Sequence, residues 1–209
     1  MHRTAFLDAA AIAVDLLADP AVADRWHEPS ALAELSVGGL ADHLRRQLSM
    51  VVEALDSPAS DQEPRDLAAH YAAAAWLGRD IDAPPNVAIR EQSEEAAAGG
   101  PAQVLERAHV DLARLRATLP ELPGDRAVPL WTGWALRLDD LLVTRMMEIS
   151  VHGDDLAVSV GVPTPTFPPQ VITPVLGLLS ALAVARHGQT AVLRALSRRE
   201  RAPETISAL

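Results

Sequence analysis

The sequence predicts an all-α protein, and three observations favour this fold class. Aromatic residues make up only 3% of the 209-residue chain, and alternating β-branched runs, which are typical of strands, are missing. Alanine is abundant. Apolar residues instead recur at spacings of three and four, the period of a helix with one buried face. Four long amphipathic segments with long connections predict a four-helix bundle with extra short helices and a helical C-terminal extension.

The first half of the chain holds two of the four long helices. The first is expected from about Thr4 to Ala18, before an Asp-Pro pair, and an irregular link follows it. Ser36 is a suitable N-cap for the second, which should run to about Leu55. Its apolar stripe is Val37, Leu40, Leu44, Leu48, Val51 and Leu55. Short helices are expected over residues 66–77 and 87–98.

The third long helix restarts after a Gly-Gly-Pro break at Gly99–Pro101, because proline is tolerated in the first turn of a helix. A proline-containing segment with two tryptophans follows and is predicted to be a loop. The fourth long helix then covers about residues 137–160.

The C-terminal extension begins with a segment of four prolines, which is typical of a stiff linker. Two further helices are expected, over residues 170–187 and 190–199. We therefore divide the chain into a metal-binding bundle over 1–160 and a helical extension over 161–209.

The composition excludes several classes of partner. A formal net charge of -10 disfavours nucleic acid, which requires a basic stripe. No uninterrupted apolar run reaches the ~18 residues that span a bilayer, and the N-terminal segment is too acidic and amphipathic for a secretion signal. We expect a cytoplasmic protein with no membrane partner. One late arginine cluster is interpreted as a solvated helix face: Arg194, Arg198, Arg199 and Arg201.

The chain has neither cysteine nor lysine. Without cysteine it has no disulfide, no thiolate metal ligand and no thiol nucleophile of its own. All 18 basic residues are arginine, which excludes Schiff-base chemistry and a P-loop lysine. A chain rich in alanine and arginine but free of lysine indicates a high-GC genome such as an actinobacterial one.

The fourth long helix carries two polar stripes instead of one. The first, at spacings of four, four, three and four, is Thr144, Glu148, His152, Asp155 and Ser159. The second is Asp139, Ser150 and Asp154. A surface helix needs only one wet face. We therefore expect one of the stripes to face a polar pocket inside the bundle.

Glu148 and His152 are suited to bind a metal ion together. At positions i and i+4 their Cβ atoms lie ~5–6 Å apart, so both side chains can reach one cation at ~2.0–2.2 Å. His43, at the border of the second helix's apolar stripe, offers a third ligand. Three protein ligands with open coordination positions are typical of a catalytic zinc site. A surface Glu–His pair and a packing histidine at position 43 are the alternatives.

Other residues could support such a site. Asp155 could orient His152. Arg145 could pair with an anionic substrate or form a salt bridge with Glu148.

Aromatic residues offer further candidates for the pocket. Trp131 and Trp134 could line its mouth or pack in the core, and Tyr71, the only tyrosine, could supply a hydroxyl. The histidines without a partner at helical spacing are interpreted as ordinary polar residues: His27, His70, His109 and His187.

Two segments resemble the signature regions of the maleylpyruvate isomerase N-terminal domain family, which belongs to the DinB-like metal-binding four-helix bundles. They read WHEPSALAELSVGGLADHLRRQ and LLVTRMMEISVHGDDLAVSVG, and the resemblance extends over about residues 3–160. The matching positions are Trp26, Ser30, His43, Glu148, His152, Asp155 and Leu156. The resemblance places the family's metal triad on His43, Glu148 and His152 without substitution.

The resemblance implies a thiol-dependent isomerase or transferase that acts on a small molecule. Its cofactor would be a divalent metal, zinc or nickel, and its cosubstrate a low-molecular-weight thiol, mycothiol. The isomerase has a separate C-terminal α/β domain that helps to close over the substrate, whereas the residues after Val160 here are predicted to be helical. The resemblance therefore implies the bundle and the metal, but it does not by itself imply the specific isomerisation of maleylpyruvate.

Three alternatives stay open at this point. The chain could be a non-catalytic bundle that binds a ligand or a partner, with a structural or absent metal. It could also be a metal-dependent hydrolase that needs no thiol. A homodimer is a further open option.

Overall fold

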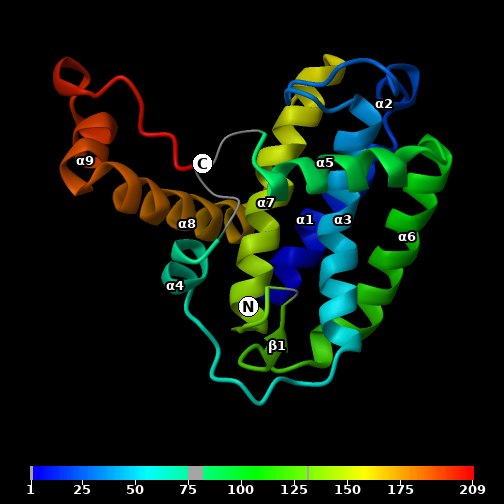
Figure 1. Ribbon diagram of the computed structural model, residues 1–209, viewed down its shortest axis with the longest axis horizontal. Helices are drawn as coiled ribbons and strands as arrows, with labels where there is room; N and C mark the ends of the chain where they lie inside the picture. The colour runs from blue at the N-terminus through cyan, green and yellow to red at the C-terminus, as the bar shows by residue number, and fades with distance from the viewer. Residues whose placement is uncertain (1, 75–81, 131) are drawn as a thin grey trace.

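Four long helices form a bundle in the computed structural model, which describes residues 2–74, 82–130 and 132–209 (Figure 1). These helices are α1 (His2–Leu17), α3 (Val37–Asp56), α6 (Pro101–Thr118) and α7 (Leu138–Val160). α3 packs against both α6 and α7, and α1 packs against the same two helices. The four-helix bundle predicted from the sequence is confirmed, and α1, α3 and α7 lie within about three residues of their expected bounds.

The apolar stripe of α3 forms the centre of the core. Leu40, Leu44, Leu48 and Val51 are all fully buried, and each buried aliphatic side chain stabilises the fold by ~1.5–3 kcal/mol. Ser36 begins the helix as predicted, since its Oγ accepts a hydrogen bond from the Gly39 amide at 2.9 Å.

α7 is the longest helix, and it is surrounded by other elements. It contacts α1, α3 and α8 (Pro169–His187), so its apolar residues are buried on more than one side. It ends at Gly161, whose left-handed backbone (φ +72°) is a conformation that glycine adopts without a steric penalty.

Two elements lie where the sequence predicted irregular chain. A five-residue helix, α2 (Pro20–Asp24), occupies part of the link after α1 and is capped by the Asp19 carboxylate. The predicted loop before α7 contains an antiparallel hairpin of β1 (Ala127–Pro129) and β2 (Ala135–Arg137). Three-residue strands carry no periodic signal, and this hairpin is stabilised instead by the complete burial of Val128 and Leu136.

The shorter helices differ from their predicted bounds. α4 (Leu67–Ala72) ends at Ala72, whereas the predicted helix ran to residue 77. Residues 75–81, which include that predicted end, lie outside the described part of the chain. α5 (Pro84–Ala97) begins three residues before its expected start at residue 87, because Pro84 and Pro85 occupy the first helical turn, where proline is tolerated.

The C-terminal extension consists of α8, α9 (Gln189–Ser197) and a short 3-10 helix, and it projects to one side of the bundle (Figure 1). α8 packs against α7 and α1 through Val171, Val175 and Leu178. α8 is long and apolar enough to cross a membrane, by length and composition alone. The search of the sequence for uninterrupted apolar runs did not find this helix, because polar residues interrupt it. The division of the chain at residue 160 stays a prediction.

Gly38 tests how tightly the start of α3 is packed. A Cβ at this position would lie 2.7 Å from the indole ring of Trp26, which is buried and donates a hydrogen bond to the Ala97 carbonyl. Overpacking costs ~1–3 kcal/mol, more than the ~0.5–1 kcal/mol that Gly→Ala gains within a helix. We expect Gly38→Ala to lower the free energy of unfolding, measured by urea denaturation.

Gly177→Ala is the matched control, because a Cβ at this exposed position in α8 meets nothing within 4 Å. It should be neutral or stabilising. Equal effects of the two substitutions would contradict the packing described for Trp26.

Candidate metal centre

A cavity of about 640 Å³ lies between α3, α5 and α7. One face of α3 lines it at helical spacing, with His43, Arg46, Gln47 and Met50. One face of α7 lines the other side, with Leu141, Thr144, Arg145, Glu148 and His152. One polar stripe of α7 faces a pocket through Thr144, Glu148 and His152, as predicted, but the surface of this pocket is mostly apolar and not polar as expected. In the second stripe, Asp154 is exposed.

α5 supplies the third wall of the cavity. Pro85, Ile89 and Ser93 line it from this helix, and Leu32 and Leu35 line it from the segment before α3. The surface of the cavity is mostly apolar, and α3, α5 and α7 each add polar groups to it. Such a composition is typical of small-molecule sites.

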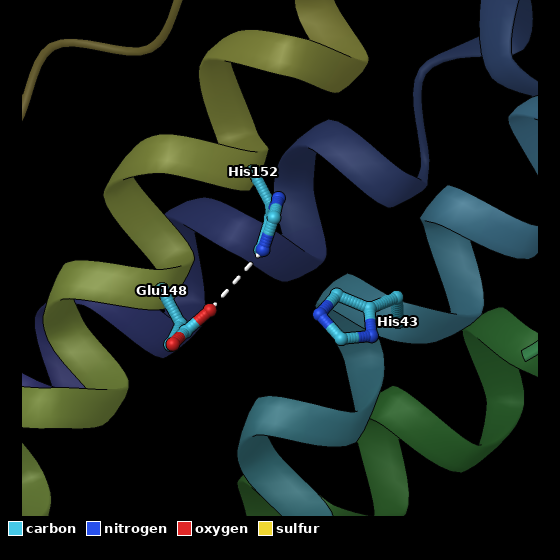
Figure 2. A group of neighbouring side chains, drawn as sticks. All are labelled: His43, Glu148 and His152. Atoms are coloured by element: carbon cyan, nitrogen blue, oxygen red, sulfur yellow. Dashed lines mark ion pairs between the residues drawn. The ribbon is translucent and has the colours of Figure 1, made fainter. Parts of the chain in front are cut away.

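His43, Glu148 and His152 converge on one point of this cavity, although more than 100 residues separate the first from the other two. One ligand atom from each lies within 4.8 Å of the others. His152 Nε2 is 3.1 Å from Glu148 Oε2, and the His43 ring stands edge-on to the His152 ring with centroids 4.7 Å apart. Figure 2 shows the three side chains directed toward a shared gap between α3 and α7.

The electrostatic environment leaves two of these side chains ready to coordinate a cation. Burial, together with the nearby charge on His152, lowers the pKa of His43 to about 4, so its ring is neutral at pH 7. Burial alone would raise the pKa of Glu148, but the hydrogen bond from His152 and the charge of Arg145 lower it to about 2. Glu148 is therefore ionised.

His152 is positively charged before any cation binds. Burial alone would lower its pKa, but hydrogen bonds to Asp155 and Glu148 raise it to about 9. Asp155 Oδ2 lies 3.0 Å from His152 Nδ1, on the side of the ring away from Glu148. A cation would therefore replace the proton on Nε2 while Asp155 holds the proton on Nδ1, an arrangement common among metal-binding histidines.

The donor set fits a divalent metal. Two imidazole nitrogens and one carboxylate oxygen are ligands typical of zinc, and imidazole also suits nickel. Small side-chain rotations would bring the three atoms onto one ion. The assignment of these residues as metal ligands itself stays a prediction.

The sequence suggested two partners for Arg145, an anionic substrate or Glu148, and the structure contains the ion pair with Glu148. Its Nη1 donates to Gln47 Oε1 at 2.7 Å, its Nε donates to Thr144 Oγ1 at 3.1 Å, and its Nη2 lies 3.9 Å from Glu148 Oε1. The buried guanidinium is thus engaged with the protein itself, and it fixes the carboxylate of Glu148 next to α3.

Neither Trp134 nor Tyr71 is among the residues that line the cavity. Trp131, the third aromatic candidate, lies outside the described residues. Trp134 Nε1 donates to His70 Nδ1 at 3.1 Å, and Arg65 stacks over its ring at 4.3 Å. Tyr71 is buried and packs edge-on against His70.

His70 is the residue that sequence reasoning missed. Its interpretation as an ordinary polar residue is wrong, because it is only 3% exposed and lines the cavity. Since the Trp134 indole is a donor only, Nδ1 must accept and Nε2 must carry the proton of a neutral ring. Burial and the charges of Arg145 and Arg65 lower the pKa of His70 to about 4, in agreement with this tautomer. No spacing in the sequence links His70 to Trp134, so no local signal could have identified it.

Comparison with known protein families gives a match over most of the chain. The family described as "Mycothiol maleylpyruvate isomerase N-terminal domain" matches residues 6–157, a range that contains all three converging side chains. No curated protein and no solved structure matches the chain.

Metal binding should release a proton at neutral pH. Because the raised pKa of His152 keeps Nε2 protonated up to about pH 9, each bound ion must expel one proton. Zinc affinity should therefore rise about tenfold per pH unit between pH 6 and 8. Calorimetry in buffers of different ionisation enthalpy measures both the number of protons released and the zinc affinity. Affinity that does not change over this range would contradict the protonation state assigned to His152.

Asp155→Asn should weaken zinc binding without removing a proposed ligand. The substitution removes the carboxylate that holds His152 Nδ1, and loss of such a contact typically costs 10–100-fold in affinity, roughly. Asp154→Asn is the matched control, because this exposed neighbour bonds Thr164 instead. Competition titrations with a zinc chelator would measure both variants, and equal affinities would argue against a positioning role for Asp155.

Proposed function

Because the chain belongs to the mycothiol maleylpyruvate isomerase N-terminal domain family, we propose that it is a divalent-metal-dependent enzyme. It uses a low-molecular-weight thiol, of the mycothiol type, to isomerise a small molecule or to form a conjugate with it. The observation that carries this proposal is the convergence of His43, Glu148 and His152 on one point of a 640 Å³ cavity. Zinc is the ion we expect, with nickel as the alternative.

The absence of cysteine agrees with this chemistry. A bound divalent cation would supply Lewis acidity, which favours the deprotonated form of an incoming thiol near neutral pH. Since the chain has no thiol of its own, the sulfur must come from a small molecule. A cavity of this size lies within the ~300–1,000 Å³ of small-molecule sites, so it can admit a thiol and a second compound.

The chain's own residues would hold the ion in a fixed orientation. Glu148 provides the single negative charge, and Arg145 and Gln47 keep its carboxylate in place. Asp155 retains the Nδ1 proton of His152 and so directs Nε2 into the cavity.

The reaction itself needs no oxidant or reductant. In an isomerisation the thiolate adds to one carbon of a polarised double bond, the resulting single bond rotates, and the thiolate leaves again. In a conjugation the thiolate stays, and a proton is added to the neighbouring carbon. We place this activity in the cytoplasm, where small thiols are kept reduced, and a homodimer stays an open prediction.

Metal content separates the proposed enzyme from a non-catalytic bundle. The protein purified without added metal should hold about one zinc or nickel ion per chain, and His152→Ala should abolish this content. His109→Ala, at an exposed position on α6, is the matched control and should retain the ion. A wild-type protein without metal that also fails to take up added zinc would favour the non-catalytic alternative.

The use of a thiol is tested on the cobalt-substituted protein. Addition of mycothiol should produce a sulfur-to-cobalt absorption band in the near ultraviolet, because a coordinating thiol is deprotonated by the metal. If no such band forms and generic esters are hydrolysed without thiol, the chain is a metal hydrolase instead.

A further inference from the structure

The cavity is positively charged although the chain is acidic. The formal net charge of the chain is -10. Among the described residues that line the cavity, however, three are arginines and only Glu148 is acidic. The arginines are Arg46 on α3, Arg90 on α5 and Arg145 on α7. A bound divalent cation would add to this excess of positive charge.

Two of the three arginines already pair with the protein. Arg145 bonds Gln47 and Thr144 and approaches Glu148. Arg90 lies 3.6 Å from the carboxylate of Asp82. Neither guanidinium therefore needs a ligand to balance its charge.

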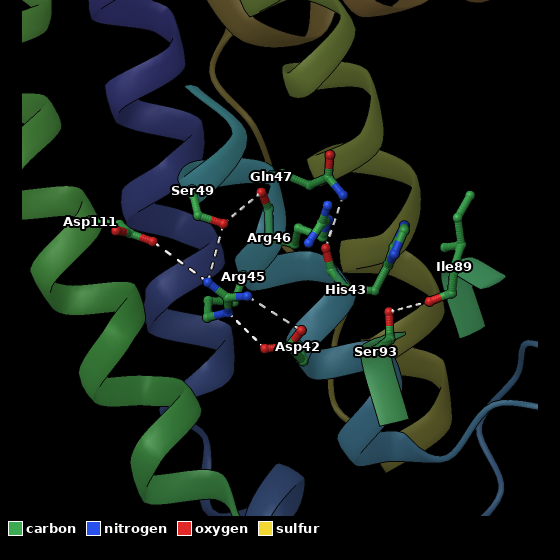
Figure 3. A network of polar contacts seen from close by, with 9 residues as sticks. All are labelled: Asp42, His43, Arg45, Arg46, Gln47, Ser49, Ile89, Ser93 and Asp111. Carbon is green, nitrogen blue, oxygen red and sulfur yellow. Dashed lines mark hydrogen bonds and ion pairs between the residues drawn. The ribbon is translucent and has the colours of Figure 1, made fainter. Parts of the chain in front are cut away.

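Arg46 differs from both. Within the described ranges its guanidinium makes no hydrogen bond and no ion pair, although the side chain is half-buried. The adjacent Arg45 provides a direct contrast, because it does not line the cavity and pairs with Asp42 at 2.7 Å and with Asp111 of α6 at 3.7 Å. Figure 3 shows this network around Arg45, whereas the contact drawn to Arg46 is the hydrogen bond that its backbone carbonyl accepts from Ser49 Oγ.

Arg46 also lies close to the candidate metal centre. It follows His43 by three residues, so the two side chains share one face of α3, and both line the cavity.

We propose that Arg46 is the anion-binding residue of the cavity and that it pairs with the carboxylate of a small organic acid. A guanidinium presents two parallel N–H donors that match the two oxygens of a carboxylate, and one arginine balances one negative charge. The apolar side chains of Met50, Ile89 and Leu141 would surround the hydrocarbon part of the same molecule. Bound in this way, the acid would lie next to the three converging side chains.

This inference rests on the proposed function only for the reaction that follows binding. The recognition of a carboxylate depends on Arg46 and can be measured without turnover. It also assigns to Arg46 the substrate-pairing role that the sequence suggested for Arg145.

Crotonate and crotonamide form a matched pair of probes, because they differ little in shape but only the first is charged. We expect the zinc-loaded protein to bind crotonate more tightly than crotonamide, measured by ligand-observed NMR titration. Arg46→Gln should weaken crotonate binding at least tenfold and leave crotonamide binding unchanged. Arg107→Gln is the control, since it removes the same charge from an exposed position on α6.

Arg46→Lys distinguishes pairing from structural damage. It keeps the charge without the two-pronged geometry, so its affinity for crotonate should fall between those of the wild type and Arg46→Gln. Absence of crotonate binding by the wild-type protein, or equal affinity in Arg46→Gln, would overturn the inference. Tighter binding of inorganic phosphate than of crotonate would overturn the assignment to a carboxylate.

Zinc content, measured in every variant, separates this inference from the proposed function. Arg46→Gln should retain the zinc of the wild-type protein, because Arg46 is not among the three converging side chains. If the wild type binds no zinc, the proposed function fails, and the same titrations on the metal-free protein still decide the role of Arg46.

Discussion

The ionised carboxylate of Glu148, enclosed between helices, requires compensating partners, and the arrangement of the site follows from that requirement. Removing a charged carboxylate from water costs several kcal/mol unless opposite charges and hydrogen bonds replace the lost solvent. Here His152 supplies a hydrogen bond and a positive charge from one turn further along α7, and Arg145 adds a second positive charge. The pKa of Glu148, lowered to about 2, shows that these partners outweigh the effect of burial.

These partners also link the site to the bundle. Arg145 connects Glu148 on α7 to Gln47 on α3, and Gln47 in turn donates to the backbone carbonyl of His43. The position of His43 relative to the pair on α7 is therefore fixed by hydrogen bonds as well as by the packing of the two helices. A divalent cation could take the place of the His152 proton in this arrangement without leaving Glu148 unpaired. We see in this exchange the physical basis of the proposed metal site.

Local patterns in the sequence were sufficient for the helices and for part of the site. The period of three and four residues located the four long helices, and the two polar stripes of α7 indicated a pocket on one side of it. The spacing of Glu148 and His152 is likewise a local property. That His43 approaches them depends on how α3 packs against α7. Its place at the border of the apolar stripe made it a candidate, and the family resemblance then pointed to it as the third ligand. The tautomer of His70 and the pairing of the β1–β2 hairpin arise from contacts between separate segments of the chain. No pattern within one helix contains such information.

Crystals of the zinc-loaded protein, measured at the zinc absorption edge, would test the central claim most directly. The account predicts one anomalous peak per chain within ~2.0–2.2 Å of a His43 nitrogen, a Glu148 oxygen and His152 Nε2. A peak bound elsewhere, or the Glu148–His152 hydrogen bond intact in fully loaded protein, would contradict it.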